Sequence, residues 1–203
     1  NYFNDIQYLF NKDVVLNYIL RPLADPDKTD LSTVYQSWWT DEYYNIQWVM
    51  HNYERPQKTD IVTEKDAYLA SVDLNLTTNL CPYIEQNPDT TFYIFFPPYS
   101  ICYWDMAKNE GTLDSQIDAE QMVIEELLKY PNVKLYSFCN NAELVCNLEH
   151  YRDQAHYDEW VNSQILKWMY NEEYLLTNEN YLDYIQTKRD FYNNYDYSAL
   201  HDK

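Results

Sequence analysis

The stretch TFYIFF at residues 91–96 decides the fold, because it is a short apolar and aromatic run with turn signals at both ends. Asn87-Pro88-Asp89 precedes the run, and Pro97-Pro98 ends it. Continuous apolar runs of this length are typical of strands that are buried on both faces, as in parallel sheets. The stretch therefore predicts a strand with both faces covered by other parts of the chain.

A second run, VKLYSF at residues 133–138, predicts another strand after the turn at Pro131-Asn132. The residues between the two runs predict helices at 101–108 and 113–129, and the longer one has apolar residues on one side and acidic residues opposite. A strand–helix–strand unit of this length implies a parallel pair of strands. The predicted fold class is therefore α/β, with many helices.

The chain of 203 residues, of which 46% are hydrophobic, is long and apolar enough to form a single domain over residues 1–203. We expect residues 1–88 to be mostly helical and residues 89–170 to hold strand, helix, strand, loop and helix in that order. Residues 171–203 should end the domain in a helix. The chain begins at Asn1 without Met, which suggests a part of a longer protein or a processed product.

The stretch YRDQAHYDEWVNSQI at residues 151–165 places Asp153 three residues before His156, at the start of a predicted helix. A carboxylate in that position can accept the Nδ1 proton of the imidazole and fix its tautomer, and Nε2 can then take a proton from a hydroxyl. The pair therefore predicts the acid and base of a nucleophilic hydrolase site. The alternative is an exposed histidine before a helix, because Asp-x-x-His occurs easily by chance in an acid-rich chain.

The order of the elements places this pair near one edge of the predicted sheet. In parallel sheets, binding and catalytic residues gather beyond the carboxyl ends of the strands. The loops at residues 97–100 and 139–141 follow the two predicted strands, and Asp153 and His156 come soon after the second. We therefore expect Asp153 and His156 at that edge, within hydrogen-bond reach of each other.

The composition excludes several classes of function. The net charge of −19 and the pI near 4.3 argue against binding to nucleic acid and against electrostatic docking on anionic lipid. Gly111 is the single glycine of the sequence, so glycine-rich phosphate loops and dinucleotide turns are excluded, and we expect no cofactor. No apolar run is long enough to insert directly into a membrane.

The residues that could bind a metal are poorly spaced, and we expect no metal. The four cysteines form no Cys-x-x-Cys pair, and scattered buried thiols are the commoner arrangement in a chain of this size. His150, Asp153 and His156 follow one another at intervals of three residues. That spacing does not place three ligands well on one helix face, and the segment precedes the predicted helix.

The chain resembles the last half of an SGNH (GDSL-type) hydrolase, in the DltD-like branch of bacterial cell-surface proteins. The resemblance rests on TFYIFFPPYS at 91–100, PNVKLYSFCNN at 131–141 and YRDQAHYDEWVNSQIL at 151–166. It implies a partial three-layer α/β/α fold of the flavodoxin-like type. It also implies an extracytoplasmic or cell-surface location, although the chain shows no signal or anchor.

The resemblance further implies a serine esterase or acyltransferase that acts on an acylated cell-wall or surface-glycan polymer. In that family the Asp-x-x-His block supplies the acid and base of the triad, here Asp153 and His156. The family's nucleophilic serine lies in a Gly-Asp-Ser block, which this chain lacks. We therefore expect the serine in a missing N-terminal segment of the same protein, and no activity of this chain alone. Ser100 or Asn140 could contribute near the site.

A different hypothesis is a non-catalytic binding or interaction module of the cell surface. The pairs Trp38–Trp39 and Tyr43–Tyr44 could form a stacking surface for sugar rings. In a chain with 23 tyrosines, the same rings could be core or ordinary surface residues. Exposure distinguishes the hypotheses, because a stacking platform is flat and exposed, whereas a catalytic pair lies in a concave pocket beyond the strand ends.

Overall fold

The computed structural model describes residues 12, 14–24, 41–58 and 65–200. The chain divides into two compact units, Asn1–Thr40 and Asp41–Lys203, and each is described by itself. In the described part of the first unit, the π-helix η1 (Val14–Leu20) continues directly into α2 (Arg21–Ala24). The expectation of a single domain over the whole chain stays a prediction.

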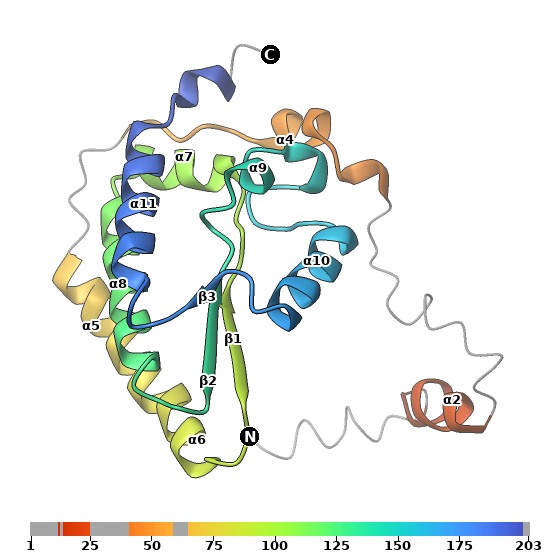
Figure 1. The fold of residues 1–203 in the computed structure, drawn as a ribbon. Helices are drawn as coiled ribbons and strands as arrows, with labels where there is room; N and C mark the ends of the chain where they lie inside the picture. The colour runs from red at the N-terminus through yellow and green to blue at the C-terminus, as the bar shows by residue number, and fades with distance from the viewer. Residues whose placement is uncertain (1–11, 13, 25–40, 59–64, 201–203) are drawn as a thin grey trace. The chain divides into compact units, whose positions relative to one another are not determined.

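The described part of the second unit contains a three-stranded sheet in the order β1-β2-β3 (Figure 1). β1 (Phe92–Phe96) and β2 (Val133–Ser137) are parallel, and they pair in register from Phe92 with Val133 to Phe96 with Ser137. The two predicted strands and their parallel pairing are therefore confirmed. The short strand β3 (Leu175–Leu176), which was not predicted, pairs antiparallel with β2 and makes the sheet mixed.

The helices of the second unit agree closely with the apolar periodicity of the sequence. The helices predicted at 101–108 and 113–129, and the helix predicted after the loop with Asp153 and His156, correspond to α7 (Ile101–Asn109), α8 (Leu113–Leu127) and α10 (Glu159–Tyr170), and the fold is α/β and rich in helices. The elements outside the sheet are η3 (Asp41–Tyr43), α4 (Ile46–Asn52), α5 (Lys65–Asn75), η4 (Leu76–Leu80), α6 (Cys81–Gln86), α7 (Ile101–Asn109), α8 (Leu113–Leu127), α9 (Ala142–Val145), η5 (Leu148–His150), α10 (Glu159–Tyr170), α11 (Tyr181–Asn194) and η6 (Tyr197–Leu200).

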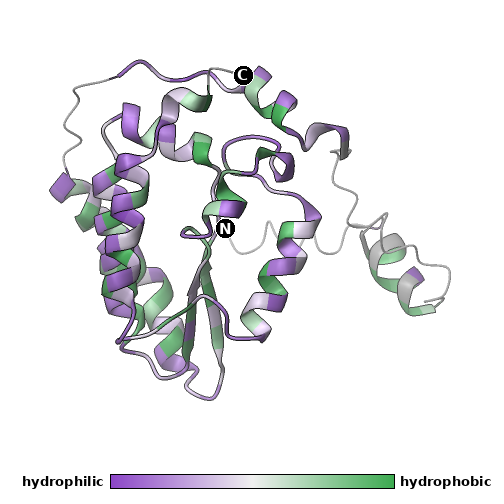
Figure 2. Cartoon of the chain, turned by 45° about the horizontal axis from the view of Figure 1, so that its top comes forward, coloured by the Kyte–Doolittle hydropathy of each residue, from purple (hydrophilic) through white to green (hydrophobic). Residues whose placement is uncertain are grey.

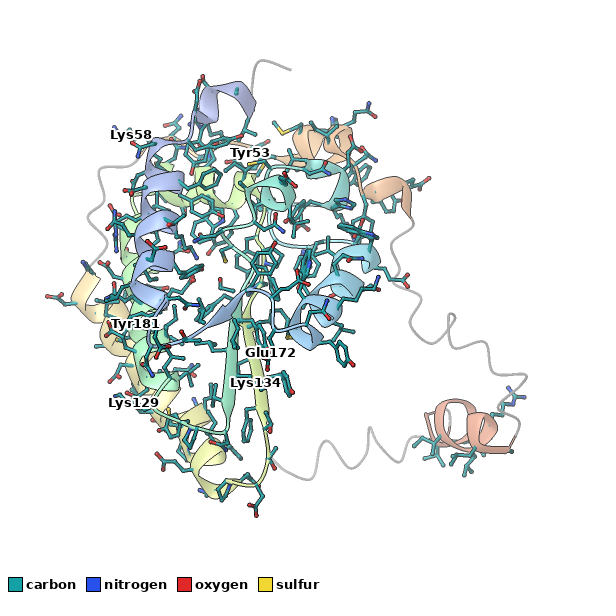
Figure 3. All side chains as sticks on the ribbon, viewed as in Figure 1. Tyr53, Lys58, Lys129, Lys134, Glu172 and Tyr181 are labelled. Carbon is teal, nitrogen blue, oxygen red and sulfur yellow. The ribbon has the colours of Figure 1, made fainter. Side chains whose placement is uncertain are left out.

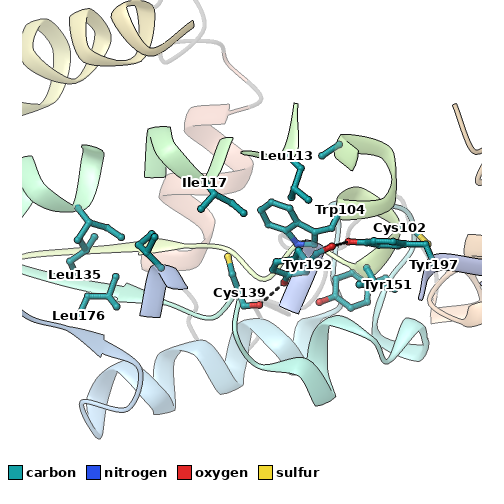
Figure 4. Close-up of a cluster of buried hydrophobic side chains, with 14 of the residues drawn as sticks. Cys102, Trp104, Leu113, Ile117, Leu135, Cys139, Tyr151, Leu176, Tyr192 and Tyr197 are labelled. Atoms are coloured by element: carbon teal, nitrogen blue, oxygen red, sulfur yellow. Dashed lines mark hydrogen bonds between the residues drawn. The ribbon is translucent and has the colours of Figure 1, made fainter. Parts of the chain in front are cut away.

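The described residues form two hydrophobic cores, and the larger one joins the strands to α8 and α11; Figure 4 shows part of it. Trp104 of α7 stacks on Tyr192 of α11 with their ring centroids 4.4 Å apart, and the Tyr192 hydroxyl donates to the carbonyl of Cys139 at 2.5 Å. Leu135 of β2 is fully buried in the same core. Figure 2 shows hydrophobic residues along the strands, whereas each helix carries both hydrophobic and hydrophilic residues. Burial of the apolar side is the main force that packs these helices on the sheet.

The smaller core lies on the opposite face of β2, under α10. Val161 and Ile165 of α10 are buried there with Tyr136 and Phe138. The Tyr136 hydroxyl also donates to the carbonyl of Met169 at 3.1 Å. Successive side chains of a strand point to opposite faces of the sheet. This alternation explains why adjacent residues of β2 enter different cores.

The prediction that the 91–96 strand is buried on both faces is wrong. Tyr93 and Phe95 of β1 are 53% and 37% exposed, whereas the alternate residues pack against the larger core. Among the described strands β1 pairs with β2 alone, and α10 packs on β2, so the α10 face of β1 is only partly covered. The rings of Tyr93 and Phe95 lie instead beside those of Tyr136 and Phe138.

The turn between α10 and β3 shows why β3 could not be read from the sequence. Glu172 and Tyr174 have positive φ angles of 59° and 61°, in a region that residues other than glycine rarely adopt. Glu172 forms an ion pair with Lys134 of β2 at 2.5 Å (Figure 3), and the Tyr174 ring packs edge-on against Phe138. Tertiary contacts therefore hold a turn that no glycine marks in the sequence.

Candidate functional site

The loop before α10 folds back on itself as a small hairpin. Tyr151 and Tyr157 form an antiparallel bridge across it. The amide of Arg152 donates to the carbonyl of His156, and the amide of Asp158 donates to the carbonyl of His150, both at 2.9 Å. We call residues 150–158 the histidine hairpin, and Asp153 and His156 lie at its tip.

The predicted hydrogen bond between Asp153 and His156 is present. The Nδ1 atom of His156 lies 2.8 Å from Oδ2 and 2.9 Å from Oδ1 of Asp153. Oδ1 also accepts hydrogen bonds from the backbone amides of Ala155 and His156, both at 2.9 Å. The backbone of the turn therefore fixes the carboxylate, and the carboxylate in turn orients the imidazole.

The electrostatics of the turn keep Asp153 ionised. Burial acts to raise the pKa of the Asp153 carboxyl, but the hydrogen bonds from the Ala155 and His156 amides and from the His156 ring lower it overall. An ionised carboxylate accepts hydrogen bonds only, so the Nδ1 of His156 must carry the shared proton. Proton transfer to and from the ring would then run through Nε2.

Two hydrogen-bonded contacts attach the histidine hairpin to the loop that follows β1. The amide and the hydroxyl of Ser100 both donate to the carbonyl of Gln154 at 3.0 Å. The Tyr151 hydroxyl donates to the carbonyl of Pro98 at 2.7 Å. Ser100 and Tyr151 are fully buried. These contacts place the tip of the hairpin beyond the carboxyl end of β1, the edge at which the order of elements predicts it.

The Asp153–His156 pair lies at the surface of the hairpin. The side chain of His156 is 58% exposed and that of Asp153 is 34% exposed. A cavity near the carboxyl end of β1 is lined by Phe96, Pro97 and Tyr99, but neither Asp153 nor His156 lines it. The pair therefore does not lie in the cavity beyond the end of β1, where a concave catalytic pocket was expected, but is open at the surface of the hairpin.

Sequence analysis missed a second histidine–carboxylate pair at the base of the same hairpin. Nδ1 of His150 lies 2.8 Å from Oδ2 of Asp158, and Oδ1 of Asp158 accepts from the amide of Val161 and caps α10. The Trp160 ring stacks on the imidazole with the centroids 4.5 Å apart. Residues 150 and 158 lie opposite each other in the hairpin. The pair could therefore have been predicted only by assuming that the loop folds into an antiparallel hairpin.

Other candidate residues have roles that differ from those considered for them. His150 binds Asp158 rather than joining Asp153 and His156, and among the residues that the structure describes no group of three potential metal ligands is found. The Ser100 hydroxyl binds the Gln154 carbonyl, and Nδ2 of Asn140 donates to the carbonyl of Tyr184 at 2.9 Å.

Only one of the two aromatic pairs of the binding-module hypothesis lies among the described residues. Trp38 and Trp39 lie outside the described residues. Tyr43 and Tyr44 are half-buried, and the Tyr43 ring packs on Trp48 with the centroids 4.4 Å apart. The four cysteines are free thiols.

Comparisons with protein-family models, with curated proteins and with solved structures all gave no match. Among the described residues, no helix has the length and apolar character needed to cross a membrane. The functional assignment therefore depends on the geometry of the histidine hairpin and on the sequence motifs that it contains.

Proposed function

We propose that this protein is a relative of the SGNH hydrolases, with a partial flavodoxin-like fold, and that Asp153 and His156 serve as the acid and base of a Ser–His–Asp site for acyl transfer. The nucleophilic serine comes from polypeptide outside these 203 residues. The observation that carries the proposal is the Asp153–His156 hydrogen bond of 2.8 Å, held by a hairpin beyond the carboxyl end of β1. An oriented imidazole at that edge is the part of a triad that a serine needs.

The proposed reaction needs only the serine hydroxyl, the His156 imidazole and the Asp153 carboxylate for its proton transfers. The serine hydroxyl attacks the acyl carbonyl carbon, and its proton passes to Nε2 of His156 while Asp153 holds Nδ1. When the ester C–O bond breaks, His156 returns the proton to the departing alcohol oxygen. Water or a second hydroxyl then attacks the acyl-enzyme by the same route, which releases the acyl group and restores the serine.

Ser100 is unsuited to act as the nucleophile, although it is near the hairpin. It is fully buried, and its hydroxyl donates to the Gln154 carbonyl at 3.0 Å. A nucleophile must reach the substrate and give its proton to the base. The contacts of Ser100 instead support a structural role in attaching the hairpin to the β1 loop.

The exposure of the pair favours a polymeric substrate. A polymer chain can reach His156 at the surface, because its side chain is 58% exposed. We propose an acylated cell-wall or surface-glycan polymer as the substrate, in an extracytoplasmic location. The alternative is a non-catalytic binding or interaction module of the same surface, in which Asp153 and His156 only stabilise the turn.

The test compares variants of His156 and His150 in the whole protein that the gene encodes, rather than in the 203-residue chain alone. We expect turnover of an acylated polymer and of a chromogenic acetyl ester, and His156→Ala should lower kcat/KM by a factor of about 10³ or more. His150→Ala is the matched control and should retain most of the activity of folded protein. Asp153→Asn should lower kcat with little change in KM.

The proposal also predicts that the 203-residue chain alone does not turn over the chromogenic ester. Turnover that disappears in Ser100→Ala would make Ser100 the nucleophile and contradict the assignment. Equal loss of activity in His156→Ala and His150→Ala would show that the hairpin acts only through its structure. No hydrolysis of any acyl ester by the protein from its own gene would favour the binding module.

A further inference from the structure

A cavity of about 200 Å³ lies between α5, α7 and α8 and the end of β1. Much of its wall is aromatic. Tyr68 comes from α5, Tyr99 follows β1, and Tyr103 comes from α7. The ring centroids of Tyr99 and Tyr103 lie 4.5 Å apart. Aromatic walls with a few polar groups are typical of sites for small molecules.

The polar part of the wall holds a buried ion pair. Glu120 lines the cavity and accepts hydrogen bonds from the Tyr184 hydroxyl and from Nζ of Lys188. Lys188 is fully buried and lies 4.5 Å from the centroid of the Trp104 ring. Burial acts to lower the pKa of Lys188, but Cys139 and Glu120 raise it overall, so its ammonium stays charged.

This ion pair determines what the cavity can attract. The charge of Lys188 offsets that of Glu120, so the wall offers little net charge to a cation or an anion. A carboxylate has about four acceptor positions, and the contacts of Glu120 with Tyr184 and Lys188 use two of them. The wall can therefore accept further hydrogen bonds from hydroxyl groups of a neutral ligand.

A packing defect does not explain why the cavity wall holds a carboxylate and a buried ion pair. The cavity is partly open to solvent, and with a carboxylate in its wall it can hold water or a polar ligand, whereas apolar voids stay dry. Burying an ion pair is also costly unless its geometry or function compensates. The cavity lies beside the carboxyl end of β1, the edge of an α/β sheet where ligands bind.

We infer that the cavity binds one neutral sugar ring of monosaccharide size, with its apolar face on the tyrosine rings and its hydroxyl groups donating to Glu120. The volume fits a single ring rather than a longer oligosaccharide. This binding does not depend on the Asp153–His156 site, because neither residue lines the cavity.

The test measures binding of glucose, galactose and N-acetylglucosamine to the 203-residue chain by saturation-transfer NMR at millimolar concentrations. We expect at least one of them to bind, and Tyr68→Ala to weaken its binding about tenfold. Tyr83→Ala is the matched control, because Tyr83 is an exposed tyrosine of α6 and is not part of the lining. It should leave the affinity unchanged.

A second variant tests the volume of the cavity. Ala119 is buried in its wall, and Ala119→Leu should fill the space and abolish binding in a chain that remains folded by circular dichroism. Three results would overturn the inference: no binding of any of the three sugars, equal effects of Tyr68→Ala and Tyr83→Ala, or tighter binding of cationic glucosamine than of N-acetylglucosamine. Each of these would leave the acyl-transfer proposal unaffected, because that proposal is tested by kcat/KM at His156.

Discussion

The two histidine–aspartate pairs of the histidine hairpin have the same chemistry but different surroundings. In both pairs an imidazole Nδ1 lies 2.8 Å from a carboxylate oxygen. His150 and Asp158 are only 25% and 22% exposed, Trp160 covers the His150 ring, and Asp158 caps α10. The Asp153–His156 pair lies at the exposed tip, and its carboxylate is held by the amides of its own turn.

A histidine–carboxylate hydrogen bond therefore does not by itself identify a catalytic site. The His150–Asp158 pair joins the base of the hairpin to the start of α10, so its removal should affect stability. The Asp153 and His156 side chains are more exposed than those of the other pair, so their removal should affect stability less and chemistry more. Variants of the four residues can test this division between the two pairs.

The largest loss of stability is expected for Asp158→Ala. The substitution removes both the cap of α10 and the partner of His150, and we expect the free energy of unfolding to fall by about 2–3 kcal/mol. Urea denaturation measures the loss. Asp158→Asn keeps an oxygen for the cap and should recover part of it. A loss below about 1 kcal/mol would contradict the structural role of this pair.

A smaller loss is expected for His150→Ala. The variant loses the stack on Trp160 and leaves the Asp158 carboxylate with one fewer hydrogen bond, which should cost about 1–2 kcal/mol in the free energy of unfolding. His150→Phe keeps an aromatic ring against Trp160 and should lose less than His150→Ala. Equal losses in the two variants would show that the stack contributes nothing.

The Asp153 carboxylate should make stability depend on pH in the acid range. Its folded-state pKa lies below the ordinary value of 3.8, so the unfolded chain binds protons more readily as the pH falls. The stabilisation should be complete above about pH 5 and lost as the pH falls through the folded-state pKa. Asp153→Asn should therefore show a smaller loss of stability between pH 5 and pH 3 than the natural chain. An NMR titration of the Asp153 carboxyl with a midpoint at or above its ordinary pKa would contradict this expectation.

The smallest effect on stability is expected for His156→Ala. The ring is mostly exposed, and exposed ion pairs contribute little to folding, so the loss should stay below about 0.5 kcal/mol. Urea denaturation beside His150→Ala makes the comparison direct. If His156→Ala proves as destabilising as His150→Ala, the tip is a structural element, and the proposed catalytic role of His156 loses its basis.

Much of the sheet and of the proposed site could be predicted from local sequence. The apolar runs at 91–96 and 133–138 predict two parallel strands, and the spacing of Asp153 and His156 predicts their hydrogen bond. The His150–Asp158 pair could not be found in the same way, because eight residues separate its members. Only the antiparallel pairing of the hairpin brings them together.

Local sequence patterns are sufficient to predict the elements whose causes are local. Apolar run length and periodicity define the two strands and the helices between them, and a short turn suffices to join Asp153 to His156. Long-range packing, in contrast, sets which faces are buried and where the hairpin is attached. Tyr93 and Phe95 are exposed because α10 packs on β2. β3 pairs with β2 after a turn in which Glu172 and Tyr174 have positive φ angles. Ser100 attaches the hairpin tip to the β1 loop. Such contacts join residues far apart in the chain, so no local pattern in the sequence can encode them.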